Sequence, residues 1–314
     1  MYAIPDHQFL KGHPGSVQNI RKAYNLDKPE RREEAIKILH EWIQKQDHIN
    51  KKDFSQEYLE RTILSCKGSV EKAKQQIDRL CTMKTLMPKF FTKTNAKIEL
   101  QRILDMGYMV PLPKLTRDNY RVILIKFNEL TNITSDMFLM YYQLNIILAE
   151  YLKANDYMTG LIVVDDHRET NLIDLVTKIN TVELQQYISI LTEGFGARVK
   201  SLYYLTDSKA VELLVKLVKQ FLSEKICRRV HVLRTLEDLH GAVPKEILPE
   251  EYGGTEKSMV KLFDELIEEL SSEKHVEYMK IMNKACTDET KRHAGKFNEE
   301  YMGMPGSFRC LSVD

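Results

Sequence analysis

The stretch ILPEEYGG, residues 247–254, separates two helical segments of the chain. Pro249 restricts its own backbone and cannot donate a hydrogen bond, which favours the end of the preceding segment. Gly253 and Gly254 allow the positive-φ turn needed before the next helix. Tyr252 joins an apolar ring to a polar hydroxyl and is suited to fixing such a turn. We therefore expect this stretch, including its two carboxylates, to be structural.

Upstream of this stretch, short β-branched runs alternate with helical segments. The runs are YRVILIKF (120–127), GLIVVD (160–165), VKSLYYL (199–205) and RRVHVL (228–233). Strands that are apolar almost throughout, joined by segments of crossover length, predict an α/β fold with a mostly parallel sheet covered by helices.

Residues 16–91 have a helical pattern throughout. In the segment from Pro29, apolar residues recur at helical spacing and mark one buried face: Ala35, Ile36, Leu39, Trp42 and Ile43. We predict an all-helical N-terminal domain over 1–94, an α/β domain over 95–258, and a C-terminal helix and tail over 259–314.

The composition excludes several classes of protein. Of 314 residues, 43% are apolar and 29% charged, which is typical of a globular protein with a sizeable core. The net charge of +1 gives no reason to expect nucleic acid as a partner. Between residues 194 and 234, however, the chain has nine basic residues and only three acidic ones.

Five scattered cysteines without CxxC spacing favour neither a disulfide framework nor a zinc site. The N-terminus lacks the pattern of a signal peptide, and the most apolar segment, residues 137–152, is interrupted by polar residues. We expect a cytoplasmic monomer without metal or cofactor, whose membrane contact is peripheral.

Two further segments allow more than one interpretation. VVDDHRE, residues 163–169, ends a strand, where α/β enzymes often carry catalytic groups, but a solvated loop is the interpretation that we favour. Residues 207–222 form a helix that is apolar over more than half its circumference. Its pattern fits a core-covering helix and a lid over a lipid cavity equally well.

Basic residues flank this helix. Arg198 and Lys200 alternate on one strand, and Lys225 and Arg229 are four residues apart. A solvated surface is the usual interpretation of scattered charges. Beside an apolar helix they also suit an anionic membrane, at roughly 1 kcal/mol per basic residue.

The segments GLIVVDD, FLSEKICRRVHVL (221–233) and LPEEYGG, in this order and spacing, resemble the CRAL-TRIO lipid-binding family. The resemblance covers residues 54–258, and LPxEYGG is its most specific part. The tail GSFRCLSVD (306–314) resembles that of insect tocopherol-transfer-like members. The resemblance implies an α/β cage that holds one hydrophobic molecule behind a mobile gate helix, here residues 207–222, with the helical domain docked beside it.

The resemblance also implies site residues. A phosphoinositide-binding cluster falls on Arg198, Lys200, Lys225 and Arg229, which are all basic here. The implied ligand-lining positions are Leu139, Tyr142, Ile146, Ile162, Val164, Tyr187, Ile190, Leu191, Phe195, Val199, Leu202, Val211, Leu214, Val215, Val218 and Leu222. The two tyrosines could orient a polar group of the ligand.

The chain departs from the family pattern in three places. The Asn-x-Pro that opens the gate helix reads Thr206-Asp207-Ser208, and an arginine-rich stretch reads Leu64-Ser65-Cys66-Lys67. The glycine that usually follows the acidic strand end is replaced within VVDDHRE. The hinge and the headgroup contact of relatives therefore cannot be assumed here.

These observations predict a non-enzymatic carrier of a retinoid, carotenoid, tocopherol or related isoprenoid that exchanges its ligand at phosphoinositide-containing membranes. A phospholipid or phosphoinositide exchange protein of the same fold is one alternative. A second is an interaction scaffold whose cage is filled by its own side chains. An enzyme remains an alternative only through VVDDHRE.

Overall fold

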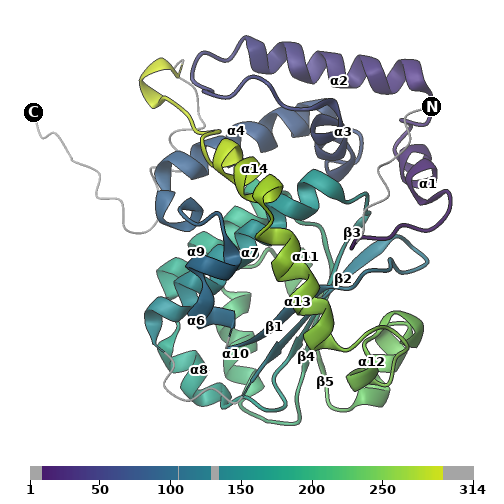
Figure 1. Ribbon diagram of the computed structural model, residues 1–314, viewed down its shortest axis with the longest axis vertical. Coiled ribbons are helices and arrows are strands. Elements are labelled where there is room, and N and C mark those ends of the chain that lie inside the picture. The colour runs from purple at the N-terminus through teal and green to yellow at the C-terminus, as the bar shows by residue number, and fades with distance from the viewer. Residues whose placement is uncertain (1–8, 105, 129–133, 293–314) are drawn as a thin grey trace, which may run out of the picture.

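The computed structural model describes residues 9–104, 106–128 and 134–292 (Figure 1). The tail at 306–314, on which the insect-type branch was predicted, lies outside the described residues. Among the described helices, none has the length and hydropathy needed to cross a membrane.

The N-terminal helices pack around a core of their own. They are α1 (Ser16–Ala23), α2 (Pro29–Gln44), α3 (Gln56–Ser65) and α4 (Val70–Leu86). The hydroxyls of Ser55 and Ser69 cap α3 and α4. The continuous helical pattern of the sequence is broken between α3 and α4 at Lys67 and Gly68, which both have positive φ. A 3-10 turn (η1, Pro88–Phe91) and short helices α5 (Ala96–Glu99) and α6 (Gln101–Leu104) lead to the sheet.

A five-stranded sheet forms the second unit, with the order β1-β2-β3-β4-β5. Its strands are β1 (Gly107–Pro111), β2 (Tyr120–Phe127), β3 (Gly160–Asp166), β4 (Val199–Leu205) and β5 (Val230–Leu233). Strands β2 to β5 are parallel, and β1 is antiparallel to β2. The four parallel strands confirm the predicted α/β class, whereas the sequence did not predict β1.

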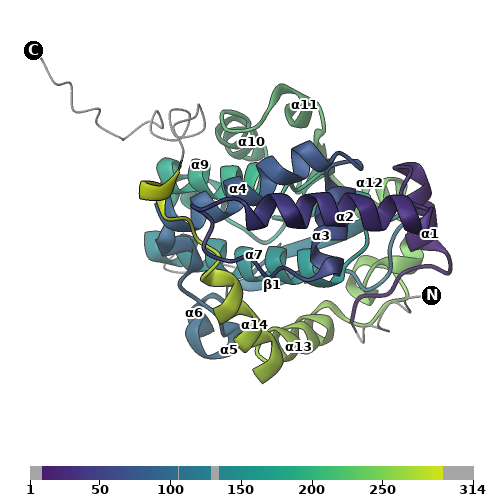
Figure 2. The ribbon, with the colours of Figure 1, turned by 90° about the horizontal axis from the view of Figure 1, so that it is seen from above.

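Helices cover both faces of this sheet. The crossover helices are α7 (Ser135–Asn155), α8 (Leu172–Lys178), α9 (Thr181–Ser189) with the π-turn η2 (Ile190–Gly194), α10 (Val211–Lys219) and α11 (Glu224–Cys227). The opposite face packs against α12 (Leu236–Ala242) and α13 (Met259–Leu270). Viewed from above, α13 and α14 (Glu273–Asn283) lie on one side and α9 to α11 on the other (Figure 2).

The ILPEEYGG stretch begins at the last residue of the 3-10 turn η3 (Lys245–Ile247) and forms a second one, η4 (Glu250–Tyr252). Gly253 has φ of 70° as predicted, but Gly254 is needed for space instead, because a Cβ there would lie 1.9 Å from the carbonyl oxygen of Leu248. The Tyr252 hydroxyl donates to Asp166 at the end of β3 (2.7 Å). The stretch thus attaches the last turns to the sheet.

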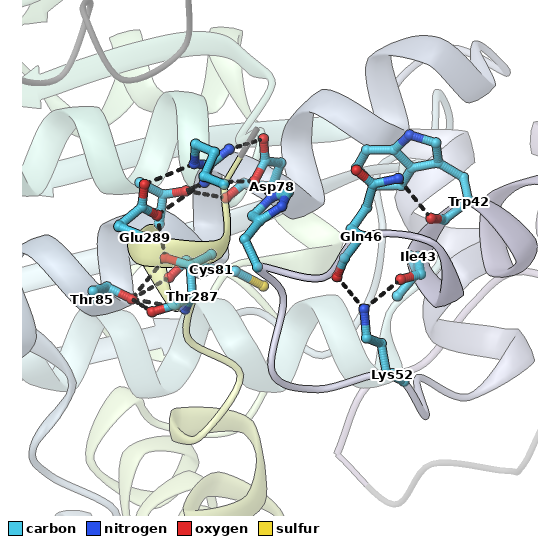
Figure 3. A network of polar contacts seen from close by, with 12 residues as sticks. Trp42, Ile43, Gln46, Lys52, Asp78, Cys81, Thr85, Thr287 and Glu289 are labelled. Carbon is cyan, nitrogen blue, oxygen red and sulfur yellow. Dashed lines mark hydrogen bonds and ion pairs between the residues drawn. The ribbon is translucent and has the colours of Figure 1, made fainter. Parts of the chain in front are cut away.

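The C-terminal segment returns to the helical domain. Arg292, which follows η5 (Glu289–Lys291), forms an ion pair with Asp78 of α4 at 2.8 Å. Thr287 lies within hydrogen-bond distance of Thr85 at 2.9 Å (Figure 3). These contacts attach the C-terminal segment to α4 of the helical domain.

Candidate ligand cavity and basic surface

A cavity of about 170 Å³ lies between the sheet and the helical domain. Its apolar walls come from α3, α7, strands β2 and β3, and the α9–β4 segment, and include Leu64, Ile123, Ile125, Leu148, Leu152, Leu161, Val163, Tyr187, Leu191 and Phe195. The cavity therefore spans the junction of the two units predicted from the sequence.

Strand β3 presents Leu161 and Val163 to the cavity. Ile162 and Val164, which the sequence predicted to line it, point to the other face and pack in the core beneath α12 and α13. That part of the prediction is wrong by one residue, because alternation along a strand places neighbouring side chains on opposite faces.

Most other predicted ligand positions form an apolar cluster beneath α10, which we call the gate cluster. Its predicted members are Leu139, Tyr142, Ile146, Tyr187, Ile190, Leu191, Phe195, Leu202, Val211, Leu214, Val215, Val218 and Leu222. Of these, Tyr187, Leu191 and Phe195 also line the cavity. Val199 begins β4 beside Leu161. The structure therefore brings three of the sixteen predicted positions to the cavity itself.

A stacked pair of tyrosines joins the cavity to the gate cluster. The rings of Tyr142 and Tyr187 lie 4.4 Å apart with an interplanar angle of 18°. Burial raises the pKa of both hydroxyls, which therefore stay neutral at physiological pH. Separation of the two rings would therefore not require the movement of a charged group.

The gate helix α10 is shorter than the predicted 207–222. It buries Val211 and Leu214 against the gate cluster, whereas Leu213 is 51% exposed on its outer side. In place of the Asn-x-Pro opening, the Thr206 hydroxyl accepts from the backbone N–H of Ser208 (3.2 Å). Arg234 also donates to the Thr206 and Ser208 carbonyls, which ties the opening turn to the end of β5.

The four predicted basic residues meet at the amino ends of β4 and β5. Arg198 donates to the Tyr24 hydroxyl (2.6 Å), and Arg229 donates to the Val199 carbonyl. Lys225 lies on α11, one helical turn before Arg229. None of the four forms an ion pair with a carboxylate in the described part of the chain. We call these four residues the basic quartet.

Lys200 occupies a bulge in β4, since Val199 pairs with Leu161 and Ser201 with Ile162. Its Nζ lies 5.6 Å from the centre of the Tyr120 ring. The simple alternation that we expected between Arg198 and Lys200 is therefore wrong. Both residues nevertheless lie at the amino end of β4.

The sequence of this unit matches a known family. Residues 105–254 match the CRAL/TRIO domain. The chain therefore contains a CRAL/TRIO domain. Residues 28–99 match the Pinta-like UBA domain. Alpha-tocopherol transfer protein-like proteins of Mus musculus and Homo sapiens are each 24% identical over 235 residues, which cover 73% of this chain and 67% of theirs.

Among solved structures, the crystal structure of Sfh5 is similar over 87% of this chain and 99% of that chain, with a TM-score of 0.46 and 11% identity. The resemblance to the CRAL-TRIO family, which the sequence indicates over residues 54–258, is confirmed by the CRAL/TRIO domain match.

Several cavity residues were not predicted. One face of α7 supplies residues at helical spacing, namely Asn145, Leu148, Ala149, Leu152 and Lys153, and Asp156 follows just after the helix. Helix α3 adds Arg61, Leu64 and Ser65. The spacing on α7 was a usable signal, but the helix is apolar around most of its circumference and does not reveal which face meets the cavity.

The VVDDHRE segment is only in part the solvated loop that was expected, since Asp166 and His167 are 1% and 2% exposed whereas Arg168 and Glu169 are exposed. Asp166 pairs with Arg168 and accepts from Tyr252, and these contacts outweigh burial and lower its pKa. His167 Nε2 lies 3.3 Å from Asp165 Oδ2, and both ring nitrogens lack a hydrogen-bond partner among the described residues. The motif thus divides into a structural ion pair and a buried Asp-His contact.

Proposed function

We propose that this protein is a carrier that binds one small hydrophobic ligand and exchanges it at phosphoinositide-containing membranes. The cavity between the sheet and the helical domain carries this proposal, because apolar side chains form most of its wall. The relatives whose names refer to alpha-tocopherol transfer support a ligand of isoprenoid character.

Loading of such a ligand requires rearrangement. The cavity of about 170 Å³ is smaller than the roughly 300–1,000 Å³ of sites for drug-sized molecules. Outward movement of α10 and separation of the Tyr142–Tyr187 stack would join the cavity to the space of the gate cluster. Burial of about 500 Å² of ligand is worth roughly 12 kcal/mol relative to water, and a membrane offers a similar environment. Exchange is then nearly balanced, and opening of the gate sets its rate.

The basic quartet supports peripheral contact with an anionic membrane. Its charges lack carboxylate partners in the described chain, and Lys200 and Lys225 are exposed. Four such groups contribute about 4 kcal/mol at an anionic surface, which is roughly three orders of magnitude in Kd. The exposed Leu213 on α10 adds an apolar contact.

A vesicle experiment tests this proposal. We expect glutamine at all four positions of the basic quartet to abolish preferential binding to phosphoinositide vesicles, and the milder Lys200→Gln/Lys225→Gln variant to lose part of it. Transfer of fluorescent retinol between vesicles should slow in parallel. The matched control replaces four exposed lysines by glutamine: Lys37, Lys97, Lys280 and Lys291.

Unchanged binding by the folded quadruple variant would contradict the membrane part of the proposal, as would equal loss in the control. Transfer at the same rate with and without phosphoinositide would contradict the coupling between membrane contact and gate opening. Thermal melting of each variant shows whether it is folded.

A further inference from the structure

Lys153 is a buried lysine in the cavity wall. It lies near the end of α7, is only 9% exposed, and its Nζ has no hydrogen-bond partner among the described residues. This nitrogen lies over the Tyr58 ring, 5.2 Å from its centre. A buried ammonium group normally pairs with a carboxylate, because removal from water disfavours the charge. Lys153 therefore lacks the partner that such a position calls for.

The two carboxylates nearest to Lys153 in the sequence, one on α7 and one just after it, are engaged elsewhere. Glu150, three residues before it, accepts from Lys84 (3.4 Å) and from the Tyr278 hydroxyl (3.1 Å). Asp156, three residues after it, accepts two hydrogen bonds from Arg121, at 2.8 and 2.9 Å. Neither acid accepts a hydrogen bond from Lys153, although the charge of Glu150 acts on it from a distance.

The charged groups of the cavity wall are mostly positive. Arg61, Lys153 and Arg198 line it, against the single carboxylate Asp156 among the described lining residues. Arg61 donates to backbone carbonyls at the end of α7, and Arg198 donates to a tyrosine hydroxyl. Both arginines thus have fixed positions, and the amine of Lys153 is the cation left to bind a ligand.

We propose that Lys153 binds the carboxylate of an apolar acid whose hydrocarbon part occupies the cavity. The inference rests on the proposed carrier function and specifies the chemistry of its ligand. A protonated amine has donors only, so it prefers an acceptor, and a carboxylate also supplies the missing negative charge. An alcohol or an ester of the same chain supplies no charge.

The pH dependence follows from the surroundings of Lys153. Burial lowers its pKa to about 8. The ionisable groups that act on it are Cys66 at the end of α3, Arg61 of α3, Glu150 of α7 and Lys84 of α4. The Cys66 thiol has a pKa raised by burial and stays neutral. Affinity for a carboxylate should therefore be full below about pH 8 and should fall as pH rises above it.

The test compares palmitate, hexadecanol and methyl palmitate by displacement of a fluorescent retinoid. The Lys153→Met variant should bind palmitate on the order of tenfold to a hundredfold more weakly than the wild type, with the alcohol and the ester unaffected. Lys153→Arg should retain most of the palmitate affinity. Lys280→Met, which removes an exposed lysine on α14, is the matched control. In the wild type, only palmitate affinity should fall between about pH 7 and about pH 9.

Three outcomes would overturn the inference. The wild type could bind palmitate and hexadecanol with equal affinity, and Lys153→Met could leave both affinities unchanged. This result would leave the carrier function intact but would show that Lys153 does not bind the carboxylate. Equal weakening of all three ligands in Lys153→Met would indicate packing alone. Failure of the wild type to bind any of them or the retinoid would contradict the proposed function itself.

Discussion

Lys153 also affects the stability of the chain. Its pKa of about 8 in the folded protein lies below the 10.5 of an exposed lysine, so the unfolded chain binds more protons between these values. Burial of Lys153 therefore lowers the free energy of unfolding below about pH 8. This destabilisation disappears as pH rises toward 10.5. We predict that Lys153→Met raises the free energy of unfolding at pH 7 by roughly 2–3 kcal/mol, and by less at about pH 10.

Urea unfolding of both proteins at the two pH values measures this gain. Lys280→Met again serves as the control, and it should change stability by less than about 0.5 kcal/mol. A less stable Lys153→Met protein would show that the lysine is a structural group. Higher stability together with weaker palmitate binding is the pattern expected of a functional group that is retained at a cost.

The sequence could predict some individual residues of the site and not others. The resemblance fixes the positions of the basic quartet, and its role at a phosphoinositide stays a prediction. The choice between Ile162 and Leu161 failed because β3 is apolar on both faces, so its pattern contains no alternation that identifies the cavity side. Lys153 could not be singled out because its lack of a partner depends on residues distant in sequence, such as Arg121.

At the scale of elements, α10 offers two adjacent leucines with opposite environments. Leu213 is 51% exposed, whereas Leu214 is 5% exposed in the gate cluster. We predict that Leu213→Ala weakens vesicle binding and slows transfer severalfold, with stability changed by less than about 0.5 kcal/mol. Leu214→Ala should instead lower the free energy of unfolding by about 2–4 kcal/mol.

Vesicle co-sedimentation and urea unfolding of the two variants separate these effects. If Leu213→Ala bound vesicles as the wild type does, the outer side of α10 would not be the part that meets the membrane. The Leu214→Ala variant shows how far a loss of stability alone affects transfer.

Elements with strong sequence signals were predicted, and those with weak ones were not. The four parallel strands follow long β-branched runs. β1 (GYMVP) is short, begins with glycine and ends with proline, so its pairing with β2 is decided by tertiary context. The predicted helix at 207–222 is shortened to α10, and at its start residues 206–208 form a hydrogen-bonded turn instead.

At the scale of the whole molecule, the cavity depends on both matched regions. Helix α3 of the helical domain supplies Arg61, Leu64 and Ser65, whereas α7 and the sheet supply most of the remaining wall. The basic quartet lies beside this junction, with Arg198 common to both the cavity and the quartet. Contact with an anionic surface and opening of the cavity can thus be linked through one residue. The predicted domain limits of 1–94, 95–258 and 259–314 stay a prediction.

Native mass spectrometry of the purified protein, followed by organic extraction, tests the central claim most directly. We predict one apolar molecule per chain, released by extraction and, on return to the stripped protein, able to raise its melting temperature. An extracted phospholipid would favour the exchange protein instead. A chain without bound mass, whose melting temperature responds to no lipid, would contradict the carrier function and favour a scaffold.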